Sequence, residues 1–390
     1  AHPQAVRNEF DIPIELEDCH TALENHLTKV VGEAGKRIHT GRSRNDQVIA
    51  ALRLFGRDHV LRFSEAYADL ISALKQVAED NRHTAIPGFT HTRQAMPITL
   101  GFLFHAYADI FADNIDWIER AYAHLNRSPL GSASGFGVAI DLDRTMVASL
   151  LEFDCVQENT LAVQQDRGKT ESLVLGVLST VLTDVGRLAH DLITYSSEAF
   201  AWIALPDDIT TGSSIMPQKR NPDILELIRA QAARLRARRI ECENIYAGMF
   251  AGYHRDFQLC KEAFVIGLQD ATTTVQAMTA VIPKLQVDNA ACEASLLRST
   301  AATDELYGRV AKGATFRDAY KAVGTAAMNS LDIDPTTSWQ SRLHLGSPGA
   351  WTSNRVQDRL ATFGVWLGQK REAQQRAFDN CLSLREHPPG

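Results

Sequence analysis

The stretch VLGVLSTVLTDVGRLAHDL, residues 174–192, indicates the fold of this chain more directly than any other. Its apolar residues recur at alternating steps of four and three: Val174, Leu178, Val181, Val185, Leu188 and Leu192. That spacing places them in one stripe along a single face of an α-helix. Because proline is absent from 130 to 205, this helix can run well beyond the usual length.

Two further proline-free stretches, 14–86 and 223–282, are long enough for similar helices. The first shows the same helical period at Val48, Leu52, Phe55, Phe63, Leu70, Leu74 and Val77. No comparable stretch alternates apolar and polar residues at period two, so strands are expected to be few. The sequence therefore predicts a mostly α fold built around a bundle of long helices.

Polar and glycine-rich punctuation divides the chain into loops and domains. Loops or helix starts are expected at 32–41, 85–97, 128–137 and 206–222. A boundary near Pro283 separates the bundle from shorter periodic segments. Three domains are predicted: 1–40, a remnant of an N-terminal domain; 41–284, the long-helix bundle that carries the chemical motifs; and 285–390, a small helical domain.

Composition excludes several classes of partner. With 40 Lys and Arg against 47 Asp and Glu, the net charge of −7 argues against a nucleic acid or a membrane surface. No uninterrupted apolar run reaches the roughly 18 residues that span a bilayer. The six cysteines form no CxxC pair, which is typical of reduced thiols in a cytoplasmic protein, and no metal site or cofactor is predicted.

Residues 211–222, TGSSIMPQKRNP, form the strongest candidate for a site. Asn221 is expected to cap a following helix, with Pro222 in its first turn. Free backbone N–H groups, the positive end of that helix and the Lys219 ammonium all favour an anion. The expected ligand is a substrate whose carboxylate gains charge during the reaction. The alternative, an ordinary glycine-serine loop with a solvated lysine, stays open.

Two other clusters contain groups that can bind or protonate a substrate. In IHTGRSRNDQ, residues 38–47, Arg44 and Asn45 can clamp a carboxylate. Taken alone, this cluster is more typical of a capped helix start with surface arginines. In FTHTRQAMP, residues 89–97, His91 can transfer a proton near neutral pH. A structural histidine is the alternative.

Two further candidates for the site would act only together with neighbouring side chains. Glu226 lies five positions past Asn221 and would act by hydrogen bonding to the His91 imidazole; otherwise it is an exposed helix charge. In GYHRDFQLCK, residues 252–261, the side chains of Tyr253, Gln258 and Lys261 are expected near one another, as they also would be on a surface helix.

Together these segments resemble the fumarase/aspartase superfamily, whose GSSxMPxKxN signature reads GSSIMPQKRN at 212–221. The string GRSRNDQ at 41–47 is similar to the argininosuccinate lyase family and its delta crystallin relatives. Agreement extends to 90–91, 128–132 and 253–261, and so covers most of the predicted bundle.

The resemblance implies reversible elimination of argininosuccinate to arginine and fumarate, a step of arginine biosynthesis. In the family the first serine of the pair, here Ser213, is the base, and Lys219 and Asn221 stabilise the doubly charged aci-carboxylate. His91, supported by Glu226, matches the family's candidate acid. Positions that match substrate-binding residues are Arg44, Asn45, Thr90, Asn221, Tyr253, Gln258 and Lys261. Family members are homotetramers in which each active site combines three chains.

This chain departs from the family pattern in three places. The family usually reads THxQRAQP around His91, whereas this chain has Arg93 and Gln94 in exchanged order and Met96 in place of a glutamine. The turn after Gly131 is also different, and the N-terminal domain is shorter by several tens of residues. Two alternatives therefore stay open: another fumarate-releasing lyase acting on malate, aspartate or adenylosuccinate, or a non-catalytic, crystallin-like structural relative.

Overall fold

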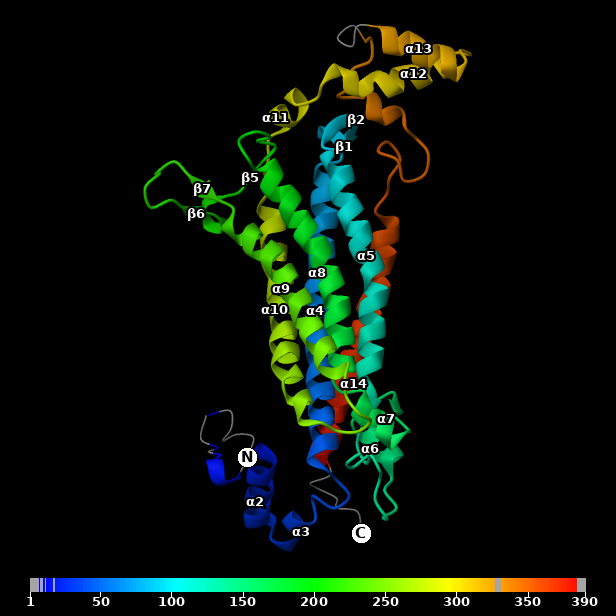
Figure 1. The fold of residues 1–390 in the computed structure, drawn as a ribbon. Coiled ribbons are helices and arrows are strands. Elements are labelled where there is room, and N and C mark those ends of the chain that lie inside the picture. The colour runs from blue at the N-terminus through cyan, green and yellow to red at the C-terminus, as the bar shows by residue number, and fades with distance from the viewer. Residues whose placement is uncertain (1–6, 8–9, 11, 17, 327–330, 384–390) are drawn as a thin grey trace.

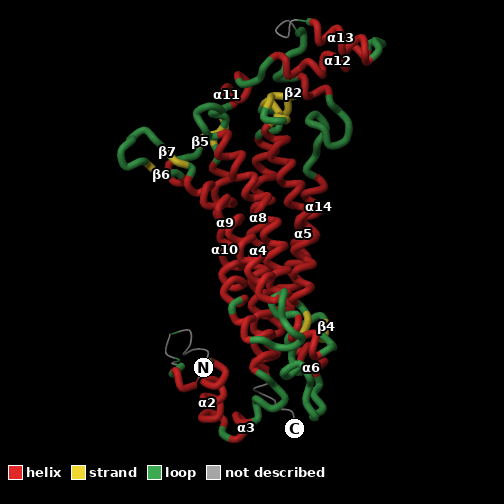
Figure 2. The backbone as a smooth tube through the Cα atoms, viewed as in Figure 1, coloured by secondary structure: helices red, strands yellow, loops and turns green. Residues whose placement is uncertain are grey.

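The computed structural model describes residues 7, 10, 12–16, 18–326 and 331–383. Long helices dominate, and strands are short (Figure 2), which confirms the mostly α prediction. The bundle consists of α4 (Arg44–Asp80), α5 (Leu100–Leu125), α8 (Lys169–Tyr195), α9 (Asp223–Tyr246), α10 (Cys260–Val281) and α14 (Asn354–Ser383). Figure 1 shows these helices side by side along one elongated body.

Shorter elements lie at the ends and sides of the bundle. Near the start of α4 are η1 (Ile14–Leu16), α2 (Cys19–Val31), α3 (Glu33–Lys36), β3 (Arg127–Ser128), α6 (Arg144–Leu150), β4 (Cys155–Val156), α7 (Thr160–Gln165) and η3 (Arg255–Gln258). Towards the other end are β1 (Ala85–Thr90), β2 (Arg93–Thr99), β5 (Ile203–Ala204), η2 (Asp207–Ile209), β6 (Thr211–Gly212), β7 (Arg220–Asn221), η4 (Ile282–Lys284), β8 (Gln286–Val287), α11 (Asn289–Ala294), η5 (Arg298–Ala301), α12 (Ala302–Ala311), α13 (Phe316–Thr325) and η7 (Ser338–Ser341).

The apolar stripe of residues 174–192 lies inside the bundle, as its spacing predicts. Each of its six members is at most 1% exposed: Val174, Leu178, Val181, Val185, Leu188 and Leu192. They belong to α8, which packs against α5, α9 and α10. Burial of an apolar side chain of this size contributes roughly 1.5–3 kcal/mol, so this stripe is a major part of the core.

Helix α8 also has the length and composition of a membrane span, alone among the described helices. However, 61% of its most apolar window is buried within the bundle. Burial of this kind is what the core helix of a soluble bundle shows, and it accounts for the apolar composition.

The C-terminal helix α14 returns to the bundle instead of forming part of a small domain. Val356, Phe363 and Leu367 lie in the same hydrophobic core as α4 and α5. Ion pairs add to this packing, for example from Arg371 to Asp58 at 2.9 Å. The small domain predicted over 285–390 is therefore wrong for α14; a separate apolar cluster contains Leu306, Ala319, Val323 and Leu331.

Residues 85–97, predicted as a loop or a helix start, form most of the antiparallel β1–β2 hairpin. The prediction was wrong because the polar residues clustered in this stretch belong to two paired strands and the turn between them. Pro87 and Pro97 lie opposite each other in the hairpin. Proline lacks an N–H but is tolerated in a strand edge that has no further neighbour, and this sheet has only two strands.

A buried polar network attaches α4 to the segments beside its first half. The Asp166 carboxylate lies 3.3 Å from the Arg53 guanidinium and 2.8 Å from that of Arg127. Arg53 also donates to the Gln157 side chain. Burial raises the pKa of Asp166, but His124, Arg53 and Arg127 outweigh it and hold that pKa well below its usual range. Burial lowers the pKa of Arg53 to about 10.

We expect Asp166→Asn to destabilise the fold, because it leaves the Arg53 guanidinium buried without its counter-charge. Removing one partner of a buried ion pair costs about 3–5 kcal/mol. The measurement is the free energy of unfolding in urea at pH 7, with the exposed Asp141→Asn as control.

The pH dependence has a definite sign. A carboxyl whose pKa is lowered by folding stabilises the protein above its unfolded pKa of about 4. That stabilisation is lost as pH falls below this value. The difference in the free energy of unfolding between wild type and Asp166→Asn should therefore become smaller at acidic pH. A difference that is small at pH 7, or that grows on acidification, would contradict this assignment.

Candidate active site

The predicted site residues lie at opposite ends of the bundle (Figure 1). Arg44 and Asn45 begin α4, whereas Thr90 and His91 follow its far end. At 1.5 Å per residue, the 37 residues of α4 span about 55 Å. One copy of the chain therefore cannot bring Arg44 and His91 to the same substrate.

Helix α2 supplies oxygen acceptors to Arg44 at the first end. The Arg44 guanidinium lies 3.3 Å from Glu24 Oε2, 3.4 Å from Asp18 Oδ2 and 3.3 Å from Thr21 Oγ1. These contacts fix the direction of a long, flexible side chain. The Arg44 side chain is still 31% exposed, so part of its guanidinium is left to meet a ligand.

The start of α4 is itself held by Asp46. Its buried carboxylate accepts hydrogen bonds from the backbone N–H groups of Ser43 at 3.0 Å and Ala133 at 2.9 Å. With the Ser43 side chain as N-cap, this is a capping box. Burial raises the pKa of Asp46, against these hydrogen bonds. The Ser-x-x-Asp spacing in residues 43–46 is the sequence signal for this role.

Tyr253, Gln258 and Lys261 lie at the same end as Arg44. The Gln258 amide donates to Tyr253 Oη at 2.6 Å, and Lys261 is in the first turn of α10. Burial lowers the pKa of Lys261, and the nearby Arg167 charge lowers it further, while Asp18 raises it. Asp18 therefore links Lys261 electrostatically to the Arg44 end.

His20 and Arg167 also belong to this cationic cluster, although neither was predicted from the sequence. Burial lowers the pKa of His20, Asp18 opposes this, and Arg44 and Lys261 lower it again. Arg167 is buried and donates to the Phe257 carbonyl at 3.2 Å. No local motif marks either residue, because the cluster exists only after α2, α8 and α10 have come together.

At the other end, His91 and Thr92 form the tip of the β1–β2 hairpin. Thr90 pairs with Arg93, which leaves a two-residue turn. Both turn residues have positive φ, 52° and 58°, as a type I′ turn requires. For residues other than glycine, this conformation costs roughly 1–2 kcal/mol each. Backbone strain of this kind is concentrated at functional sites, and the His91 side chain is exposed.

Ser213 opens a seven-residue loop between β6 and β7. The strands pair Thr211 with Asn221 and Gly212 with Arg220, and the hairpin projects from the side of the bundle (Figure 1). Ser213 Oγ accepts hydrogen bonds from the backbone N–H groups of Met216 at 3.2 Å and Ile215 at 3.4 Å. The Lys219 side chain is exposed on the same loop.

The helix after this loop begins one residue later than the sequence predicts. Pro222, not Asn221, is the N-cap of α9, and no side chain caps that end. Asn221 stays extended because its backbone belongs to β7. Glu226 lies in the first turn of α9 and is exposed. Within the described chain, Glu226 and His91 make no hydrogen bond or ion pair with each other.

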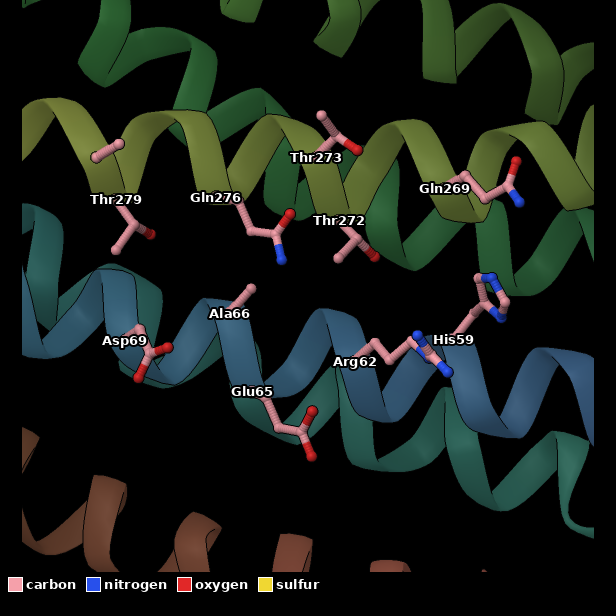
Figure 3. Close-up of a pocket in the computed structure, with 11 residues that line it drawn as sticks. His59, Arg62, Glu65, Ala66, Asp69, Gln269, Thr272, Thr273, Gln276 and Thr279 are labelled. Carbon is pink, nitrogen blue, oxygen red and sulfur yellow. The ribbon is translucent and has the colours of Figure 1, made fainter.

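A groove of about 720 Å³ lies between α4 and α10 (Figure 3). Helix α10 lines it with hydroxyl and amide groups such as Thr272 and Gln276, and α4 lines it with charged groups such as Arg62 and Asp69. None of the predicted site residues lines this groove. The candidate active site is therefore dispersed over three places: the Arg44 end, the His91 turn and the Ser213 loop.

Comparison with known proteins supports the motif-based assignment. Residues 4–236 match the model of a family described as lyase. The chain is 40% identical to argininosuccinate lyase of Thermotoga neapolitana, over 80% of this chain and 79% of that protein. It is 39% identical to the enzyme of Sorangium cellulosum, over 92% and 83% respectively.

Solved structures agree on the fold. An EDDS lyase in complex with formate has a TM-score of 0.79 at 24% identity, covering 94% of this chain and 80% of that one. Class II fumarase from Schistosoma mansoni has a TM-score of 0.69 at 16% identity, covering 81% and 76%. The chain thus shares its fold with these structures, and the sequence identities to the curated relatives show that it belongs to the argininosuccinate lyase family.

Proposed function

We propose that this chain is a carbon-nitrogen lyase that converts argininosuccinate reversibly to arginine and fumarate. The observation that carries the proposal is the presence of the complete set of motif residues, at three separate places of a fumarase-like fold, in a member of this family. Because α4 holds two of these places about 55 Å apart, we further propose that each active site combines segments of different copies in a homotetramer.

Ser213 is assigned as the base that removes a proton from the carbon next to a substrate carboxylate. A serine hydroxyl is an ordinary weak acid, so its alkoxide must be stabilised by its surroundings. The two backbone N–H groups that point at Ser213 Oγ supply part of this stabilisation. The Lys219 ammonium supplies a full positive charge on the same loop.

Loss of the proton leaves an aci-carboxylate with two negative charges. Lys219 and Asn221 are assigned to stabilise this charge, since both offer donors to a carboxylate oxygen. The C–N bond to the guanidino nitrogen then breaks and leaves the carbon–carbon double bond of fumarate. The leaving nitrogen takes a proton from His91, which Glu226 of the same or another copy would orient.

The Arg44 end is assigned to substrate binding. Arg44, Asn45, Tyr253, Gln258 and Lys261 combine positive charge with neutral donors, which suits the carboxylates and amino group of an amino-acid substrate. Thr90, beside His91, is assigned to the part of the substrate that reacts.

The proposed assembly of several copies would explain why the Ser213 loop exposes apolar side chains. Ile215 at its tip is 82% exposed, and Met216 is 37% exposed. Large apolar side chains that gather on a projecting loop mark an interaction site. A neighbouring copy would cover them and deliver its own residues to Ser213. The proposed location is the cytoplasm, and neither nucleic acid nor membrane is proposed as a partner.

The retained residues favour an enzyme over a structural protein. A crystallin-like structural role needs neither Ser213, Lys219 nor His91, and the chain keeps all three. Another fumarate-releasing lyase is a closer competitor, because the changed strip at Arg93, Gln94 and Met96 adjoins His91.

Turnover of four substrates tests the activity. We expect ultraviolet absorbance of fumarate to grow when the protein meets argininosuccinate, and to stay flat or nearly so with malate, aspartate and adenylosuccinate. A higher kcat/KM for any of the other three would assign the substrate differently. No fumarate from any of the four would contradict the lyase assignment.

Ser213→Ala is expected to lower kcat by about 10²- to 10⁴-fold, the usual contribution of a general base. KM should change much less, because a base acts on the barrier and not on ground-state contacts. Steady-state kinetics with argininosuccinate provide the measurement. Ser214→Ala is the matched control in the same loop and should lose far less; equal losses in the two variants would remove Ser213 from its role.

Mixing two inactive variants tests the composite site. If Ser213 and His91 of one active site come from different copies, hybrids of Ser213→Ala and His91→Asn chains contain sites in which both residues are intact. Random assortment makes roughly a quarter of the sites complete. Activity should therefore reappear after the two proteins are unfolded together and refolded. Hybrids that stay as inactive as either parent would show that both residues act from one chain.

A further inference from the structure

The two faces of the β1–β2 hairpin have different surroundings. On one face, the Phe89 ring lies 6.0 Å from the Phe200 ring and 6.2 Å from that of Trp202. Gln94 pairs with Phe89, and its amide donates to the Ser295 carbonyl at 2.8 Å and accepts from the Leu297 N–H at 3.1 Å. This face is therefore attached to the rest of the protein.

Thr90 and Arg93 point to the opposite face. Side chains alternate along a strand, so the residues next to Phe89 and Gln94 project away from those contacts. Thr90 and Arg93 are directly paired, which places their Cβ atoms about 4.5–5.5 Å apart on the same face. Both are exposed, and both adjoin the strained His91–Thr92 turn.

This geometry shows what the order of Arg93 and Gln94 does in this chain. The inward position donates to one backbone carbonyl and accepts from one backbone N–H, both through the Gln94 amide. A guanidinium has donors only and cannot make the second bond. In the family pattern the arginine occupies position 94. The exchange therefore moves a permanent positive charge to the face that carries Thr90.

The Arg93 guanidinium has no ion-pair or hydrogen-bond partner among the residues that the structure describes. By contrast, Arg44 is held by Asp18 and Glu24. An unpaired guanidinium beside a substrate-binding threonine is free to form two parallel hydrogen bonds to a carboxylate. A solvated surface arginine would also be unpaired, and the experiment below separates the two.

We propose that Arg93 is a further substrate-binding residue whose guanidinium binds a carboxylate of the fumarate part of the substrate. The inference rests on the proposed function for the identity of that dicarboxylate. Arg93 would act together with Thr90 from the same hairpin, and so from the copy that supplies His91. Arg93 would give this chain a charged contact to fumarate. The glutamine of the usual family pattern is neutral and cannot provide one.

The test compares wild type, Arg93→Gln, Arg93→Lys and the control Arg317→Gln, an exposed arginine of α13 far along the chain. Arg93→Gln places the glutamine of the family pattern at position 93. Because this position is exposed, the fold should be retained. Direct binding of fumarate and of arginine to each assembled protein is measured by calorimetry, and KM and kcat for argininosuccinate are measured alongside.

Arg93→Gln should weaken fumarate binding about 10-fold or more, as the loss of a charged hydrogen bond implies. Arginine binding and kcat should change less than about 2-fold, Arg93→Lys should be intermediate and Arg317→Gln should match wild type. Unchanged fumarate affinity in Arg93→Gln, or an equal loss of arginine affinity, would overturn the proposal. Failure of the proposed function would give a different result: the wild-type protein would bind fumarate but would not cleave argininosuccinate.

Discussion

The unbroken helix α4 is the constraint on which the rest of the structure depends. Its 37 residues form a rod that separates Arg44 from the β1–β2 hairpin by the full length of the bundle. The Asp46 capping box fixes where the rod begins, and the buried Arg53–Asp166 pair attaches its first half to neighbouring segments. A helix so anchored cannot bend to bring its ends together, so any chemistry shared by those ends must take place between copies.

The pattern of partners in the single chain is consistent with that constraint. At the Arg44 end, α2 already surrounds the guanidinium with oxygen acceptors, and Asp18 also acts on Lys261 and His20. At the opposite end, His91 and Ser213 lie on projecting hairpins. The groups that we propose for substrate binding are thus held within one copy, whereas those that we propose for proton transfer are presented outward. In the proposed assembly, such a division would complete a site without rearranging the core of any copy.

The sequence predicts those features that depend on local periodicity or capping. The stripe from Val174 to Leu192 identified the central helix, and the signature at 212–221 identified the loop that carries Ser213. Features set by tertiary pairing were predicted poorly. Asn221 failed as a cap because its backbone is paired in β7, and the β1–β2 hairpin was missed because the polar residues in it indicated a loop. Helix α14 was assigned to a separate domain because its partners are more than 200 residues away in the chain.

The sequence selects His91 as a candidate but does not predict the strained turn that carries it. A type I′ turn normally selects asparagine or glycine, and this chain has His91 and Thr92 there at a cost of roughly 1–2 kcal/mol each. The flanking Thr90–Arg93 pair and the inward Gln94 contacts hold the hairpin closed despite that cost. These contacts offset the strain of the turn and support it from one face. Its other face carries the exposed His91 and Arg93 side chains, for which we propose contact with the substrate.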